Sequence, residues 1–173
     1  MVFYGKTLSK NIPRLAGAKG KKPENRSGVT VGIGVDLGQD SPNGFLQKMK
    51  RRNTGTQKIP EEELIRLHEK ITPYFQKFGG EACQFLRENP LVLTLDESHF
   101  LNKVAHGELL NKTIQDYSSI ATKKGAKKFT ELPTEQQTAL LLDGYNRGTV
   151  SEDLINAVIR GNNSVVHAAL NRK

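Results

Sequence analysis

A threonine and an aspartate stand six positions apart in SGVTVGIGVDLGQ, residues 27–39 of a basic and mostly polar chain. The stretch alternates between apolar and small or polar residues. One set is Val29, Val31, Ile33 and Val35, and the other is Thr30, Gly32, Gly34 and Asp36. A period of two residues predicts a short strand or hairpin with one apolar face. Thr30 and Asp36 are therefore expected to project from the opposite, polar face.

A carboxylate that activates water, assisted by a hydroxyl group, is one half of a glycosidase site. Thr30 and Asp36 are candidate catalytic residues on this reasoning. Gly32 and Gly34 lie between them and leave the backbone bare, so we predict that a substrate approaches closely there. The same pattern is also typical of a tight hairpin whose glycines serve turns and whose Asp36 caps a following helix. The pattern alone leaves both interpretations open.

Nucleotide binding is a weaker interpretation of the same glycines. GIGVDLG has the spacing G-x-G-x-x-x-G, which is one residue off the dinucleotide fingerprint, and no βαβ alternation follows it. GVDLGQ also has the look of the phosphate loop of actin-like ATPases. Those folds need a much longer chain and further nucleotide loops, which are not found in this sequence.

The rest of the sequence predicts helices, so the expected fold class is α+β and predominantly helical. Helices are predicted at 44–52, from Pro60 and its three following glutamates to an interruption at Pro73, at 81–88, from Asp96 onward, within LPTEQQTALLLDGYNRG (132–148), at 151–159 and at 164–170. Asp96 is expected to cap its helix, and Thr134 with Gln137 is expected to form a capping box. Gly148 stands where a C-terminal glycine belongs. Leu64, Ile65, Leu67 and Ile71 supply the predicted apolar face of the second helix.

A chain of 173 residues is long enough for one domain with a core. We predict a single domain over 1–173, made of a basic irregular segment (1–28), a β element (29–40) and a helical lobe (43–173).

The only cysteine, Cys83, cannot form an internal disulfide bond. The histidines lack metal-ligand spacing, so we expect no metal and no cofactor. No apolar run is long enough for a membrane span, and no signal peptide is visible.

The net charge of +8 is concentrated at the beginning of the chain. Residues 1–28 hold seven lysines and arginines but a single acidic residue, Glu24. Such a segment attracts polyanions, which include nucleic acid, anionic lipid and an anionic cell wall. Nucleic-acid binding is disfavoured because no basic stripe with interleaved aromatic residues is present.

Two ordered blocks resemble one known family. SGVTVGIGVDLGQ is similar to the signature of the pesticin-type, phage-lysozyme-like muramidases. FTELPTEQQTALLLDGYNRG (129–148) resembles a helix of the same family. Residues 70–98 also resemble the family's sequence. The resemblance covers about residues 27–170 and implies a lysozyme-like fold with a small β-hairpin and a helical lobe. It places Thr30 and Asp36 on the family's catalytic threonine and aspartate.

The resemblance also implies a general acid, but no residue of this sequence stands at the position where the family carries it. The family carries a glutamate upstream of the threonine, at the end of an N-terminal helix. Residues 1–23 contain no aspartate or glutamate. Three explanations stay open: the glutamate-bearing helix lies outside this chain, Glu24 serves as the acid, or the domain binds glycan without cutting it. The single domain is accordingly predicted to lack an N-terminal helix.

The implied activity is cleavage of the β-1,4 bond between N-acetylmuramic acid and N-acetylglucosamine in peptidoglycan. The chain is thus predicted to be a muramidase of an antibacterial toxin, an effector or a phage-type lysin. The alternative is an inactive or truncated lysozyme-like domain that binds peptidoglycan or an immunity protein without turnover. Either way, we expect a monomer, or a domain of a larger toxin, that acts in the periplasm or cell wall of a target bacterium.

Overall fold

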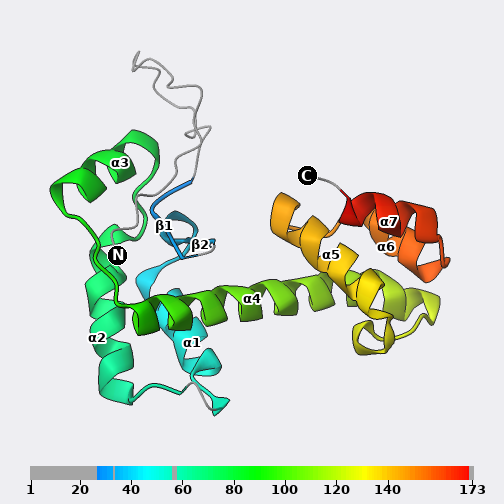
Figure 1. Cartoon of the computed structure of the whole chain (residues 1–173), viewed down its shortest axis with the longest axis horizontal. Coiled ribbons are helices and arrows are strands. Elements are labelled where there is room, and N and C mark those ends of the chain that lie inside the picture. Colours follow the sequence, from blue (N-terminus) through cyan, green and yellow to red (C-terminus); the bar gives the residue numbers. More distant parts are fainter. Residues whose placement is uncertain (1–26, 33, 56–57, 172–173) are drawn as a thin grey trace. The chain divides into compact units, whose positions relative to one another are not determined.

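The computed structural model describes residues 27–32, 34–55 and 58–171. This part of the chain contains seven α-helices and one two-stranded antiparallel sheet (Figure 1). The predicted fold class, a predominantly helical α+β fold, is confirmed. Two compact units divide between Ala105 and His106. The single-domain boundaries stay a prediction. Of the segment predicted to be basic and irregular (1–28), residues 1–26 lie outside the described residues.

The first unit is built from the hairpin and the helices that follow it. The hairpin pairs strand β1 with strand β2 and leads through a short 3₁₀ helix, η1, directly into α1 (Figure 1). The elements are β1 (Thr30–Val31), β2 (Val35–Asp36), η1 (Leu37–Gln39), α1 (Pro42–Arg52), α2 (Glu61–Ile71), a 3₁₀ turn η3 (Thr72–Tyr74) and α3 (Gly79–Glu88). Helix α4 (Leu95–Ala121) belongs to both units, because its residues 95–105 fall in the first and 106–121 in the second.

Helix α1 begins at Pro42, two residues before the predicted start at Gly44, and α2 begins directly after Pro60. The Ser41 hydroxyl accepts a hydrogen bond from the Gly44 N–H at 3.1 Å, and Pro42 occupies the first turn of α1. Three glutamates fill the first turn of α2, near the positive end of its dipole. The predicted apolar face of α2 is too wide, since Ile65 is 40% exposed whereas Leu64, Leu67 and Ile71 are buried. Ile65 is one position away from the strip that faces the core.

The start of α4 differs from the prediction. Asp96 lies inside the first turn, and Thr94 is the capping residue. The Thr94 hydroxyl accepts the Glu97 N–H at 3.2 Å, and the Glu97 carboxylate accepts the Thr94 N–H at 2.7 Å. Threonine followed three residues later by glutamate is the capping box, and it outcompetes a lone aspartate because it satisfies two N–H groups at once. Burial raises the pKa of Glu97, but hydrogen bonds from Lys70 and Thr94 outweigh it and leave the pKa below its ordinary value.

The second unit contains α5 (Thr134–Arg147), α6 (Glu152–Ile159), α7 (Asn163–Leu170) and two short 3₁₀ helices, η4 (Thr122–Lys124) and η5 (Phe129–Glu131). The predicted capping box of α5 is wrong. Thr134 is already helical, and the Gln137 amide donates to the Leu132 carbonyl at 2.7 Å instead. Pro133, whose fixed φ suits a helix start, moves the boundary one residue toward the N-terminus. Gly148 ends α5 in the left-handed region at φ 76°, as predicted.

Each unit has its own hydrophobic core. The first core joins the hairpin valines to α1, α2 and the first turns of α4, with Met49, Leu64 and Leu101 fully buried. The second joins the later turns of α4 to α5, α6 and α7 around Tyr117, Leu140 and Ile155. Among the described residues, no helix combines the length and the apolar character that crossing a bilayer requires.

One carboxylate ties α4 to the connection between α5 and α6. Asp116 accepts hydrogen bonds from the Thr149 hydroxyl and the Val150 N–H, both at 3.0 Å, and pairs with Lys112 at 3.2 Å. Partial burial raises the pKa of Asp116, but the bonds from Val150, Lys112 and Thr149 together leave the pKa below its ordinary value of 3.8. The charged form of Asp116 therefore stabilises the second unit.

Replacing Asp116 with alanine is expected to lower the free energy of unfolding by about 2 kcal/mol, because the Val150 N–H loses its acceptor. Because the folded-state pKa is lowered, this stabilisation is complete above about pH 5 and is lost as the pH falls through the folded-state value. Denaturant unfolding at pH 7 and pH 3 measures both effects. Thr149→Ala removes only one bond and should cost less. A difference between wild type and Asp116→Ala that is the same at both pH values would contradict the assignment.

Candidate functional site

Thr30 and Asp36 form a cross-strand pair in the hairpin. The register pairs Thr30 with Asp36 and Val31 with Val35. Residues directly opposite each other in an antiparallel pair project from the same face of the sheet. Thr30 and Asp36 are both half-buried, whereas Val31 and Val35 are 1% and 6% exposed on the core side. The hydroxyl and the carboxylate therefore share one face, as the alternation predicts, although Ile33 lies outside the described residues.

The Asp36 carboxylate is held through one of its two oxygens. Oδ1 accepts the N–H groups of Gly28 and Gly38, each at 2.9 Å, and thereby caps η1. The capping interpretation of Asp36 is thus confirmed. Oδ2 accepts no hydrogen bond from the residues that the structure describes. Capping and chemistry are compatible in this geometry, because one oxygen orients the carboxylate and the other meets no donor within the described ranges.

Two glycines that sequence reasoning did not select make this geometry feasible. A Cβ on Gly28 would lie 2.5 Å from the Gly38 Cα and 2.5 Å from the Lys77 carbonyl oxygen. The backbones at Gly28 and Gly38 therefore lie too close together for any side chain at position 28. This close approach lets both N–H groups reach Asp36 Oδ1. Gly28 directly precedes Val29, the first apolar residue of the alternating stretch. This position is the one sequence feature that could have indicated a role for it.

Backbone hydrogen bonds connect the site to residues 76 and 79, between η3 and the start of α3. The Gln76 N–H donates to the Leu37 carbonyl at 3.3 Å, and the Gly79 N–H donates to the Ser27 carbonyl at 3.0 Å. The Leu37 N–H in turn donates to the Val29 carbonyl at 2.9 Å. Two-residue strands are too short to hold a register by themselves, so these bonds and the buried valines fix it.

Gly32 and Gly34 adopt backbone conformations that favour glycine, with φ values of 57° and 133°. Both therefore serve the turn. Gly32 also faces Asn102 of α4, whose Oδ1 lies 2.0 Å from the position that a Cβ on Gly32 would take. At Gly32 the space beside the backbone is filled by protein, whereas Gly34 is exposed. Substrate binding by these two glycines stays a prediction. Asn102 was not found from the sequence, since nothing in its neighbourhood marks it.

Glu24, the candidate acid, lies outside the described residues. Within the described residues, no three His, Cys, Asp or Glu side chains converge to hold a metal ion.

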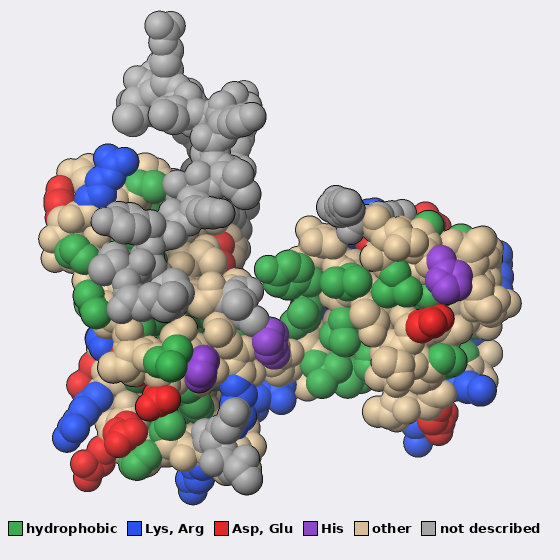
Figure 2. Space-filling model, in the orientation of Figure 1, with side chains coloured by type: hydrophobic (Ala, Val, Ile, Leu, Met, Phe, Trp, Pro, Cys, Tyr) green, Lys and Arg blue, Asp and Glu red, His purple; other side chains and the backbone are tan. Residues whose placement is uncertain are grey.

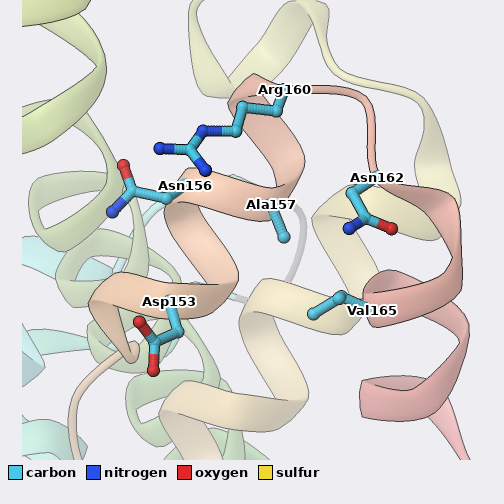
Figure 3. Close-up of a pocket in the computed structure, with 6 residues that line it drawn as sticks. All are labelled: Asp153, Asn156, Ala157, Arg160, Asn162 and Val165. Atoms are coloured by element: carbon cyan, nitrogen blue, oxygen red, sulfur yellow. The ribbon is translucent and has the colours of Figure 1, made fainter.

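A separate depression of about 470 Å³ lies on the second unit. Asp153, Asn156, Ala157 and Arg160 line it from one face of α6, and Asn162 and Val165 line it from the start of α7 (Figure 3). It contains neither Thr30 nor Asp36, so we do not assign it to the candidate site.

Replacing Asp36 separates its two roles. Asp36→Ala is expected to lower the free energy of unfolding by about 2 kcal/mol, because the buried N–H groups of Gly28 and Gly38 lose their acceptor. Asp36→Asn keeps an acceptor oxygen in the same place and is expected to cost less than half as much. Thermal or urea unfolding measures both. Equal losses for the two variants would show that the charge, rather than the acceptor geometry, holds the hairpin.

A family of known proteins matches most of the chain. The Pesticin family, described as "Bacterial toxin homologue of phage lysozyme, C-term", matches residues 9–162. The match begins upstream of the resemblance seen in the sequence and ends before α7. No curated protein matches the chain. Because the matched region covers most of the 173 residues, the chain belongs to the Pesticin family of phage-lysozyme-like bacterial toxins.

Proposed function

We propose that the chain is a peptidoglycan hydrolase, a muramidase that cleaves the β-1,4 bond between N-acetylmuramic acid and N-acetylglucosamine. The pairing of Thr30 with Asp36 on one face of the hairpin carries the proposal, in a chain that belongs to a lysozyme-like toxin family. The corresponding biological role is an antibacterial toxin, an effector or a phage-type lysin. Its site of action is then the periplasm or cell wall of a target bacterium.

Asp36 is the residue that activates the attacking water. Two N–H groups fix Oδ1, so the plane of the carboxylate is set before substrate arrives. Oδ2 then accepts a proton from a water molecule and stabilises the positive charge that develops on the sugar ring. Preorganisation of this kind lowers the barrier because the carboxylate need not reorient during the reaction.

Thr30 orients that water. Its side chain stands directly opposite Asp36 in the register, where Cβ atoms of paired residues are about 5 Å apart. A water molecule placed between the two side chains donates a hydrogen bond to the Asp36 carboxylate, and the Thr30 hydroxyl holds it in position. Thr30 therefore supports the attack but does not itself take the proton.

Glu24 is our candidate for the general acid. A sugar leaving group needs a proton from a carboxyl group. Among the family-matched residues upstream of Thr30, Glu24 is the only aspartate or glutamate. It precedes Thr30 by six positions, so the chain is long enough to bring its carboxyl group to the other side of a bound sugar.

The distribution of charge suits an anionic wall. Residues 27–105 carry ten basic and ten acidic side chains, and residues 106–173 carry nine and seven. On the face shown in Figure 2, the two signs are interspersed over the described surface. The remaining excess of six positive charges belongs to residues 1–26, which therefore supply most of the attraction to a polyanionic partner. An immunity protein in the producing cell is a second proposed partner.

Asp36→Asn is expected to reduce hydrolysis of purified cell walls by at least about a hundredfold, because an amide does not accept the water proton. Loss of turbidity measures the rate, and mass spectrometry of the released fragments identifies the bond that is cut. The control is the melting temperature of the Asp36→Asn variant. It should stay close to that of the wild type, because the amide oxygen still accepts the two N–H groups. Undiminished lysis by a folded Asp36→Asn protein would contradict the assignment of Asp36.

Glu24→Gln tests the general acid. If Glu24 donates the proton, the variant should lose at least about a hundredfold in rate, because an amide cannot protonate the leaving group. Full activity in Glu24→Gln would exclude it as the acid. Co-sedimentation with walls, without release of fragments by the wild-type protein, would instead favour the alternative of a lysozyme-like domain that binds without turnover.

A further inference from the structure

We propose that Asn102 is a positioning residue for the Thr30–Asp36 pair, acting through the turn that follows β1. The inference rests on the proposed function, because it concerns the same pair. Asn102 contacts the hairpin at Gly32, and Gly32 directly follows Val31, the last residue of β1. Asn102 does not belong to the pair itself.

Asn102 fills the space beside the Gly32 backbone. A Cβ built on Gly32 would lie 2.0 Å from Asn102 Oδ1 and 3.2 Å from its Cγ. The amide of Asn102 therefore occupies the volume that any other residue at position 32 would need for its side chain. Gly32 also has φ 57°, a conformation that non-glycine residues rarely adopt. The turn thus requires glycine at position 32 for two reasons: its positive φ, and the lack of space for a side chain beside Asn102.

Asn102 lies among buried residues of α4. Phe100, Leu101 and Val104 are 4%, 0% and 0% exposed, and they share a core with Val31 and Val35 of the hairpin. The next residue, Lys103, donates to the Thr54 carbonyl at 2.7 Å. Asn102 itself is half-buried. A side chain on so well-fixed a helical turn has little freedom, so it limits where Gly32 lies.

The position of Gly32 matters because the hairpin is minimal. Each strand has two residues, and the turn begins at Gly32. A shift of Gly32 therefore changes the register or the separation of Thr30 and Asp36 directly, with no long strand to absorb it. A displacement of about 1 Å in a catalytic group is enough to lower a rate by up to about a hundredfold.

The decisive experiment is a double-mutant cycle between positions 32 and 102, measured by melting temperature. Gly32→Ala should lower the melting temperature by about 6 °C or more, through backbone strain and the clash with Asn102. Asn102→Ala alone should lower it by about 2 °C. In the double variant, Asn102→Ala should instead raise the melting temperature above that of Gly32→Ala, because it removes the clash. Additive losses would overturn the proposal.

Two matched controls separate the contact from general effects. Gly79 has φ 52° and no atom within 4 Å of its would-be Cβ, so Gly79→Ala isolates the strain, at about 3 °C. Its effect should add to that of Asn102→Ala. Asn111 lies exposed on the same helix, and Asn111→Ala should change nothing. A rescue of Gly79→Ala by Asn102→Ala would contradict the specific contact.

A positioning role also predicts effects that a merely stabilising residue would not cause. In Asn102→Ala, the amide NMR signals of Gly28 and Gly38, which report the bonds to Asp36, should move, whereas Asn111→Ala should leave them in place. In wall hydrolysis, kcat should fall about tenfold and KM should change less than twofold. Unmoved signals or an unchanged kcat would overturn the proposal. If the wild type hydrolyses nothing, the proposed function fails, and the melting and NMR results still decide the role of Asn102.

Discussion

The hydrogen bonds from Gly28 and Gly38 to one oxygen of Asp36 are the interaction on which the candidate site depends. They join Gly28, two residues before β1, to the 3₁₀ helix after β2, so they close the ends of a hairpin whose strands have two residues each. Backbone pairing in so short a sheet contributes little order by itself. The carboxylate supplies the missing constraint, and in doing so it fixes its own orientation toward the face that carries Thr30.

This arrangement explains why a structural and a functional interpretation of Asp36 need not compete. A carboxylate has two oxygens, and a helix cap occupies only one of them. The geometry uses Oδ1 for folding and leaves Oδ2 without a donor among the described residues. Capping therefore prepares the residue for general-base chemistry, because an oriented carboxylate on a packed hairpin moves little when substrate binds.

Helix α4 has a comparable double role. Its first turns pack in the core of the first unit and present Asn102 to the hairpin, while its later turns carry Asp116 and Tyr117 in the second unit. Both units thus draw a structural contact from the same helix. The hydrogen bonds of Asp116 and the close contact at Gly32 depend on polar side chains that reach across to backbone, and such contacts do not appear in an apolar periodicity.

The sequence by itself determined the local features of this protein. Alternation predicted the shared face of Thr30 and Asp36, glutamates and prolines predicted the start of α2, and Gly148 predicted the end of α5, because each of these signals acts within a few residues. The cap predicted at Asp96 lost to the neighbouring capping box of Thr94 and Glu97, whereas the one predicted at Thr134 lost to a helix start at Pro133 that has no side-chain cap. Only the tertiary structure decided that Gly28 must meet Gly38, that Asn102 fills the space beside Gly32, and that Asp116 reaches Val150. These contacts join residues that are distant in the chain, and a single sequence carries no record of which surfaces come together on folding.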